Sequence, residues 1–464
     1  MSVLVCGVTG CVGRAVANAL RARGHKVVEG GRSLGDGQRS LHVDYMSAVS
    51  PAAWAQRLEA HGITTVVNCV GILMPGRGQS FERVHSLGPI ELFKGAAAAG
   101  VQRVLQVSAL GVGGDAQSLA TPYLHSKLLA DDALAALPVD WAVLRPSLVY
   151  GPASESAALF ATLASLPVIG LPGSGAQRVQ PIHVFELAEA IARLVEAPGP
   201  LRQVFELGGP APMAYRDMLA SYRRACGLGA AVWLPLPMAL MTLSARVAEL
   251  WPQRVFSRDT VRLLERGSVA QPNHLPALLG RQPSTLAHGL TITPPRPMLD
   301  LSVTLSPVMA GALRGALAFM WLYTALISAL LPRESGVLVL LARCGFEGAW
   351  GVAALVLSCA LNLALGTLTL LRPSPWLYAL QSAAVLGYTT TAAFSMPELT
   401  IDHCGPLVKN LPVLMTVLLL WMAAPAQRAE RRASEARSSM VPSPSGDKPR
   451  PQASGSPLPT ISPH

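Results

Sequence analysis

A succession of apolar stretches in the C-terminal third limits the fold of this chain more than any other feature. Four of them, each about 18–24 residues long, follow one another: Val308–Leu331, Trp350–Leu371, Trp376–Ser395 and Leu407–Ala424. A helix of ~20 apolar residues has the length needed to cross the ~30 Å hydrocarbon core of a bilayer. Buried helices of a soluble protein are the alternative, but four in succession favour a membrane. We therefore predict an all-α, four-helix transmembrane domain over residues 307–425.

The composition changes on both sides of this domain. Residues 1–290 are typical of a globular domain, residues 291–306 of a linker, and residues 426–464, which are polar and rich in Pro and Ser, of a disordered tail. The net charge is +10, but the arginines are scattered and few aromatic residues accompany them, so nucleic-acid binding is not indicated. The seven cysteines include no C-x-x-C pair, which favours neither a metal site nor a disulfide framework.

Short apolar runs alternate with helical segments in the first 150 residues. The runs "SVLVCG", "TTVVNCVG" and "RVLQVSAL" are typical of buried strands, and the segments 54–60, 81–99 and 123–137 have helical character. Strand–helix alternation of this kind predicts an α/β fold with a doubly wound parallel sheet. From residue 151 to residue 290 the pattern loosens, so we expect a small substrate-side subdomain there.

The stretch "GVTGCVG" contains Gly7, Gly10 and Gly13 between the first predicted strand and the first predicted helix. Glycine lets the backbone turn tightly and approach a pyrophosphate, while the helix N-terminus favours the negative charge. This context predicts a dinucleotide site, with a purely structural turn as the alternative. The other residues of the turn expected to contact the cofactor are Thr9, Cys11 and Val12.

The end of the second strand indicates which dinucleotide is bound. An acidic residue there would bind the ribose 2′-hydroxyl, whereas an arginine suits a 2′-phosphate. In "VVEGGRS", Glu29 lies inside the strand, glycines occupy its end and Arg32 follows. NADP(H) is therefore favoured over NAD(H), with a solvated loop charge as the alternative reading of Arg32. Asp44, after the third strand, is placed either to meet the adenine edge or to cap the next helix.

Tyr123 and Lys127 in "TPYLHSK" are four residues apart, so their side chains share one helix face. A free tyrosine has a pKa of ~10 and is a poor acid–base at neutral pH. A nearby ammonium, together with a positively charged nicotinamide ring, would favour the phenolate. Ser108, at a strand end, could polarise a substrate carbonyl while the cofactor supplies the hydride. A packed ring and a solvated amine on an amphipathic helix are the alternative.

The motifs "GVTGCVG", "NCVGIL", "VSALG", "YLHSK" and "LRPSLVYGP" together resemble the extended and atypical short-chain dehydrogenase/reductases. The nearest resemblance is to the branch related to the NADPH-carrying accessory subunit of respiratory complex I, and it covers about residues 1–290. It implies a Rossmann-type sheet with Ser108, Tyr123 and Lys127 as the catalytic residues at its carboxyl edge. It also implies cofactor contacts from Asn68, Val70, Gly71 and Lys127, and from Pro146 to Val149 beside the nicotinamide.

The segment "GPLVKNLPVL" and the apolar pattern before it resemble the four-helix DoxX-like membrane domain. Arg372 lies in the second loop and several arginines follow the last stretch, so the positive-inside rule predicts a multi-pass protein of the inner membrane with both termini cytoplasmic. The N-terminus shows no secretory signal, in agreement with a cytosolic first domain. Cys344 and Cys404 would then share the outer side, where a disulfide is chemically possible.

These observations predict a membrane-anchored NAD(P)H-dependent oxidoreductase that acts on a carbonyl, lipid-like or quinone-like substrate at the cytoplasmic membrane face. Its expected partners are the lipid bilayer and a small-molecule substrate. The alternative is a non-catalytic NADPH-binding scaffold or assembly factor for a membrane protein complex. A redox-sensing regulator is a third reading, which the intact pair of Tyr123 and Lys127 disfavours.

Overall fold

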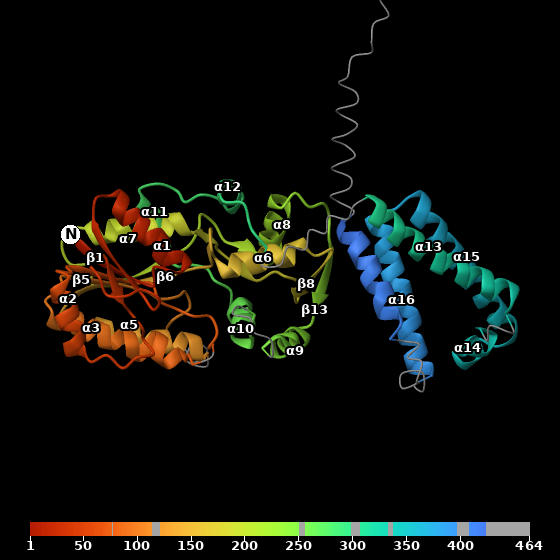
Figure 1. Cartoon of the computed structure of the whole chain (residues 1–464), viewed down its shortest axis with the longest axis horizontal. Coiled ribbons are helices and arrows are strands. Elements are labelled where there is room, and N and C mark those ends of the chain that lie inside the picture. The colour runs from red at the N-terminus through yellow and green to blue at the C-terminus, as the bar shows by residue number, and fades with distance from the viewer. Residues whose placement is uncertain are drawn as a thin grey trace, which may run out of the picture. The chain divides into compact units, whose positions relative to one another are not determined.

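The structure, a computed structural model, describes residues 1–76, 78–113, 121–249, 256–297, 307–332, 337–396 and 408–423. The chain divides into two compact units, Met1–Ser302 and Val303–His464, whose elements are labelled in Figure 1. Most of the predicted linker and the whole predicted tail at 426–464 lie outside the described residues.

A parallel sheet of seven strands forms the centre of the first unit, in the order β11-β6-β5-β4-β1-β2-β3. Its strands are β1 (Ser2–Cys6), β2 (Lys26–Gly31), β3 (Ser40–His42), β4 (Thr65–Asn68), β5 (Arg103–Val107), β6 (Asp140–Pro146) and β11 (Gln203–Leu207). The strand order reverses at β1, which pairs with both β2 and β4. The predicted doubly wound parallel sheet is confirmed, and β11 adds an edge strand beyond the region where strands were expected.

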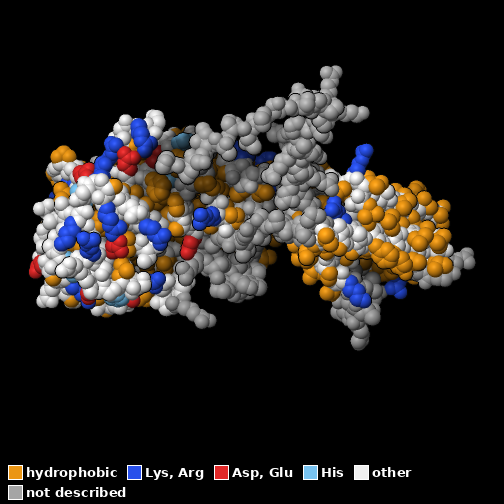
Figure 2. Space-filling view, turned by 45° about the horizontal axis from the view of Figure 1, so that its top comes forward, with side chains coloured by type: hydrophobic (Ala, Val, Ile, Leu, Met, Phe, Trp, Pro, Cys, Tyr) orange, Lys and Arg blue, Asp and Glu red, His pale blue; other side chains and the backbone are white. Residues whose placement is uncertain are grey.

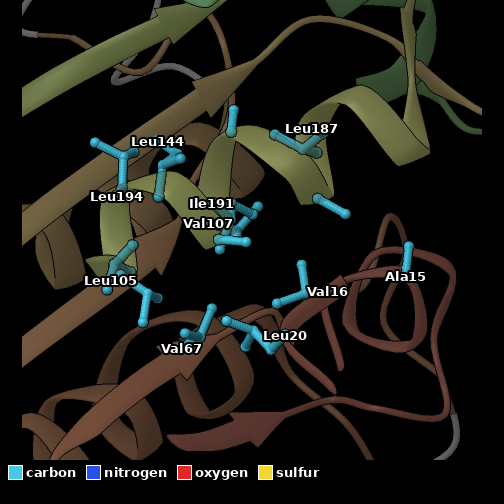
Figure 3. Packing of buried hydrophobic residues seen from close by; sticks show 14 of the residues in the cluster. Ala15, Val16, Leu20, Val67, Leu105, Val107, Leu144, Leu187, Ile191 and Leu194 are labelled. Atoms are coloured by element: carbon cyan, nitrogen blue, oxygen red, sulfur yellow. The ribbon is translucent and has the colours of Figure 1, made fainter. Parts of the chain in front are cut away.

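Helices cover both faces of the sheet because successive strand residues point to opposite sides. Val3 and Val5 of β1 belong to one hydrophobic cluster, and Leu4 and Cys6 belong to the other. The first face is covered by α1 (Cys11–Ala22), α7 (Val184–Glu196) and α11 (Leu275–Leu279), and the second by α2 (Pro51–Ala60), α3 (Gly88–Ala98) and α5 (Pro122–Ala135). Figure 3 shows α7 presenting its leucines to the strands on the first face.

The helix expected over residues 81–99 consists of two segments. A π-helix, η1 (Glu82–Leu87), precedes α3. Pro89 has no N–H to donate to the carbonyl of His85, so the regular α-helical bond cannot form at this junction. Such wide turns occur mainly as single-turn insertions near functional sites, and this one buries the His85 side chain.

Short elements after β6 build a smaller part, which was predicted to lie on the substrate side and is called the substrate-side part below. Three two-stranded pairs join β7 (Val149–Tyr150) to β10 (Ile182–His183), β8 (Val168–Pro172) to β13 (Val232–Leu236), and β9 (Arg178–Val179) to β12 (Met213–Ala214). The helices are α6 (Glu155–Ser165), α8 (Tyr215–Ala225), α9 (Met238–Ala248), α10 (Arg258–Arg266) and α12 (Leu286–Ile292). A separate hydrophobic cluster that includes Tyr150, Tyr215 and Tyr222 holds much of this part together.

The second unit is helical throughout its described part. Its helices are α13 (Pro307–Leu330), α14 (Val337–Arg343), α15 (Gly348–Leu371), α16 (Pro375–Ser395) and the helix Asn410–Ala423. Two of them, over Val308–Leu330 and Gly348–Leu371, are long and apolar enough to cross a membrane. The third predicted stretch forms α16, whose apolar character is diluted by Gln381 and by threonines. The fourth is a shorter apolar helix, and its predicted start at residue 407 lies outside the described residues.

Large apolar side chains remain exposed on this unit. Val308, Trp350 and Leu357 have exposed fractions of 83%, 77% and 73%. On the face shown in Figure 2, hydrophobic side chains dominate the helical unit, whereas Lys, Arg, Asp and Glu are scattered over the first unit. An apolar exterior of this kind is suited to lipid rather than to water.

Candidate functional site

The glycine-rich turn joins β1 to α1. Gly7 has a φ of 79°, a backbone conformation that favours glycine, and its carbonyl accepts a hydrogen bond from the N–H of Gly10 at 3.0 Å. A Cβ added at Gly13 would lie 2.3 Å from the oxygen of Gly7, so the helix can approach the turn only without a side chain there. The turn therefore brings the N-terminus of α1 to the carboxyl end of β1.

A cavity of about 140 Å³ opens at this turn. It lies at the carboxyl ends of β1 to β4, where the strand order reverses and where dinucleotides bind in doubly wound sheets. The predicted cofactor residues that line it are Gly7, Thr9, Gly10, Arg32, Asp44, Val70 and Gly71. Cys11, Val12, Gly13, Asn68, Lys127, Pro146 and Val149, all in the described part of the chain, contribute no part of this wall. The close glycine cradle and the helix N-terminus fit a dinucleotide's phosphates.

Asn68 supports the cavity wall from behind the turn after β4. Its side chain is fully buried, donates to Gln106 Oε1 at 2.7 Å, and accepts hydrogen bonds from the Tyr45 hydroxyl at 2.9 Å and the Val70 N–H at 3.3 Å. These bonds use its amide within the protein. Asn68 therefore positions Val70. The resemblance had implied that Asn68 itself contacts the cofactor.

The charges at the ends of β2 and β3 agree with the expected arrangement. Arg32 is exposed at the cavity, and within the described residues no acidic side chain pairs with it. Glu29, by contrast, forms an ion pair with Arg21 and does not line the cavity. Asp44 lines the cavity but does not cap the next helix, because its Oδ1 accepts the N–H of Met46 at 3.1 Å within a turn and Ser50 caps α2.

Tyr123 and Lys127 lie together inside the protein, on α5. Their exposed fractions are 9% and 4%, and the Lys127 Nζ lies 5.8 Å from the centre of the Tyr123 ring. The ammonium donates to the carbonyl of Val107 at 3.2 Å. A Cβ added at Gly71 would lie 3.4 Å from Nζ, so the amine borders a residue of the cavity wall. The structure thus brings this pair to the edge of the candidate cofactor site.

Burial dominates the titration of both side chains. It lowers the pKa of Lys127 to about 8, although Asp131 and Cys69 act in the opposite direction. It raises the pKa of Tyr123, which packs with Val112 and Leu124. The expected lowering of the Tyr123 pKa by the lysine is therefore not found in the protein alone. Loss of hydration disfavours the charged phenolate, and this effect of burial raises the pKa.

Ser108 is held by a buried carboxylate. Its hydroxyl donates to Asp131 Oδ2 at 2.8 Å, and Arg145 Nη2 donates to the same oxygen at 3.2 Å. Burial raises the pKa of Asp131 to about 6, against the effects of Ser108, Arg145 and Lys127. While Asp131 is ionised, the Ser108 proton is committed to it and is not free for a substrate carbonyl. The sequence analysis missed Asp131, although its position four residues after Lys127 places it on the same helix face.

His85 was also missed, and it connects the cavity wall to α5. Its Nε2 accepts the N–H of Ile72 at 3.0 Å, its Nδ1 lies 3.1 Å from Ser126 Oγ, and its ring meets the Tyr123 ring edge-on at 5.3 Å. Burial lowers the pKa of His85, and the charge of Lys127 lowers it further, so this imidazole is neutral. No local sequence signal marks it, because its partners come from distant segments.

Two family models match separate parts of the chain. Residues 3–208 match the NAD dependent epimerase/dehydratase family, and residues 318–418 match the DoxX-like family. The two matches correspond to the two units of the structure.

Curated relatives resemble the first unit. The chain is 25% identical over 223 residues to NADH dehydrogenase (ubiquinone) 1 alpha subcomplex subunit 9, mitochondrial, of Dictyostelium discoideum, covering 46% of this chain and 61% of that protein. It is 28% identical over 199 residues to the ceramide reductase of Caulobacter vibrioides, covering 42% of this chain and 61% of that enzyme. Both matches therefore span less than two thirds of the relative's length.

Among solved structures, one similar chain is an NADPH-dependent quinone oxidoreductase of Escherichia coli complexed with NADPH. The TM-score is 0.49 at 18% identity, covering 63% of this chain and 99% of that one. The protein thus consists of an NAD dependent epimerase/dehydratase domain of the atypical short-chain dehydrogenase type, related to the complex I subunit, followed by a C-terminal DoxX-like domain.

Proposed function

We propose that the protein is a membrane-anchored NAD(P)H-dependent oxidoreductase that reduces an apolar carbonyl or a quinone-like substrate at the cytoplasmic face of the membrane. The observation that carries this proposal is the buried pair of Tyr123 and Lys127 beside Gly71 of the cofactor cavity. Removing a lysine from water is costly, and binding a cofactor alone does not require a tyrosine beside it. Proton transfer next to the cofactor does.

Each residue has a definite task in this proposal. Gly7, Gly10 and the N-terminus of α1 hold the pyrophosphate. When bound there, NAD(P)H would be the source of the hydride for the carbonyl carbon. The Tyr123 hydroxyl gives its proton to the carbonyl oxygen, which yields an alcohol. Its raised pKa keeps the phenol protonated at neutral pH, and the Lys127 ammonium stabilises the phenolate left behind.

The surroundings of Tyr123 support an apolar substrate. Its ring belongs to a cluster with Val112 and Leu124, and Leu73 and Leu263 pack against that cluster. The adjoining DoxX-like unit, with two apolar helices of membrane length, would hold such a site close to lipid. The name of the Caulobacter relative, a ceramide reductase, supports a lipid substrate in particular.

The finer assignments of cofactor and orientation belong to the same proposal. Arg32 at the cavity, together with the ion-paired Glu29, favours NADP(H) over NAD(H). Arg372 and the arginines that follow residue 425 favour a cytoplasmic position for both termini, where NADPH is available.

Replacing Tyr123 by Phe tests the enzyme reading directly. It removes one oxygen and keeps the ring packing, so NADPH binding should survive while turnover falls by about 10²–10⁴, the range of general acid–base catalysis. The measurement is NADPH consumption by the purified full chain against panels of carbonyls and quinones. Tyr215→Phe, at a buried ring of the separate hydrophobic cluster, is the matched control and should keep full activity. Lys127→Met should reduce both turnover and cofactor affinity.

The second candidate is a non-catalytic NADPH-binding scaffold or assembly factor for a membrane complex. The relatives that are subunits of NADH dehydrogenase support it. Under this reading, loss of cofactor binding abolishes function and Tyr123→Phe does not. A Tyr123→Phe protein that fully complements a deletion strain would therefore reject the enzyme and favour the scaffold.

A further inference from the structure

Three leucines of the β13–α9 segment, residues 232–248, have exposed side chains. Leu234 on β13 and Leu240 and Leu243 on α9 have exposed fractions of 47%, 46% and 56%. Leu240 and Leu243 are three residues apart, so they lie on one face of the helix. Single exposed leucines are common on soluble proteins, but here three lie exposed within ten residues of one short segment.

Positive charge accompanies these leucines. Arg246, on α9 itself, is exposed. The nearby carboxylate of Glu249 is already paired with Arg258. Leucines beside an arginine are typical of segments that lie in a membrane interface, where the apolar residues enter the acyl boundary and the cation meets anionic headgroups.

The connection to α13 is short, so a bilayer crossed by α13 would stay near the first unit. The described part of the first unit ends at Pro297, and α13 begins at Pro307. Fully extended, the ten or so residues between them span at most ~35 Å. A domain joined so closely to a membrane-length helix meets lipid at a far higher local concentration than any dissolved partner.

The segment also adjoins the candidate site. After it the chain forms α10, whose Leu263 packs against the cluster that contains Tyr123. The helix that comes next in the described chain therefore packs on the cluster that contains Tyr123.

We propose that the β13–α9 segment docks on the surface of an anionic lipid bilayer, with Leu234, Leu240 and Leu243 in the acyl boundary and Arg246 at the headgroups. This contact is separate from the membrane-length helices and does not depend on whether the site turns over. It makes the first unit a peripheral membrane domain in its own right.

Depth-dependent quenching in the full chain tests the proposal. The protein is reconstituted in phosphatidylcholine–phosphatidylglycerol nanodiscs, with a fluorophore attached through a genetically encoded azide-bearing residue in place of Leu240 or Leu243. Leu129 on α5, 44% exposed, is the matched control position. Doxyl-labelled lipids should quench positions 240 and 243 several-fold more than position 129. Arg246→Glu should reduce the quenching at 243 in anionic discs.

Two results would overturn the proposal. Equal lipid quenching at positions 240, 243 and 129 would mean that the segment faces water. Protection of 240 and 243 from aqueous iodide without lipid quenching would mean that another protein surface, such as a second copy of the chain, covers it. In nanodiscs that hold a single chain, a second copy cannot cover the segment, so any protection there has another source. Circular dichroism of each labelled protein verifies that it is folded.

Discussion

Asp131 and Lys127 are charged side chains held almost entirely out of water, with exposed fractions of 3% and 4%. They lie one helical turn apart on α5. Burial raises the pKa of Asp131 to about 6 and lowers that of Lys127 to about 8, and each charge opposes the effect of burial on the other. Ser108 and Arg145 complete the group. The protonation of this group, rather than that of Tyr123 alone, is expected to set the pH range of any reaction at the site.

Asp131→Asn should lower the upper limit of the pH range in which the site is active. The Asp131 carboxylate raises the pKa of Lys127, so its loss leaves burial less opposed and lowers that pKa further below about 8. If the charged lysine stabilises the phenolate, activity will then decline at a lower pH than in the unmodified protein. The measurement is the pH profile of NADPH-dependent turnover. Asp132→Asn, at the exposed neighbouring position, should leave the profile unchanged, and an unchanged profile in Asp131→Asn itself would argue against this coupling.

Arg32→Ala should weaken NADPH binding by about 1–3 kcal/mol, the loss of a charge-assisted bond to the 2′-phosphate, and leave NADH binding nearly unaltered. Arg39 is exposed on the same connection after β2 but does not line the cavity, so Arg39→Ala is the matched control. Fluorescence titration with both cofactors measures the effect. Equal losses for NADPH and NADH would contradict the assignment of Arg32 to the 2′-phosphate.

Side chains with local signals were predictable, and those with distant partners were not. Gly7, Gly10, Arg32 and Asp44 follow strand ends at positions that the parallel sheet brings to one edge, and they line the cavity. The spacing of Asp131 from Lys127 was a local signal, but its partners Ser108 and Arg145 come from other segments, and His85 has no local signal at all. The burial that raises the pKa of Tyr123 in the protein alone was not foreseen either, because burial cannot be read from a helix face.

At the level of elements, the packing of α1 against the turn after β1 depends on Gly13. Gly13→Ala would place a Cβ 2.3 Å from the Gly7 oxygen, so the helix must move away from the turn. We expect a loss of about 1–3 kcal/mol in the free energy of unfolding, the usual cost of overpacking, together with loss of NADPH binding. At Gly35 an added Cβ meets nothing within 4 Å, so Gly35→Ala should change neither quantity. Chemical denaturation and cofactor titration provide the measurements.

The elements predicted well were those with strong apolar periodicity. The strands β1, β4 and β5 are buried on both faces, so they appear in the sequence as nearly continuous apolar runs. The π-helix η1 was not foreseen, since its wide turn arises where Pro89 interrupts a pattern that otherwise suits an α-helix. The two-residue strands of the substrate-side part are too short to show any periodicity.

At the scale of the whole molecule, the open question is which side of the membrane each loop faces. With both termini in the cytoplasm, the loop after α13 lies outside, so Cys344 in intact cells should react with a membrane-impermeant maleimide. Cys226, a partly exposed cysteine of the first unit, is the control and should react only after permeabilisation. Labelling of Cys226 in intact cells would contradict the predicted orientation, because it would place the first unit outside the cell. The predicted partner of Cys344, Cys404, lies outside the described residues, and their pairing stays a prediction.

The return of the chain to the sheet after its substrate-side part bears on whether the core there needs the second unit. Leu275 and Leu279 of α11 belong to the same core as the leucines of α7, and Arg281 pairs at 2.8 Å with the nearly buried Glu186 of that helix. A chain that stopped at residue 208, where the family match ends, would leave this face of α7 bare. The helix α11 covers this face of α7, and it precedes the membrane-length helices in the chain. This core is therefore complete without residues of the second unit.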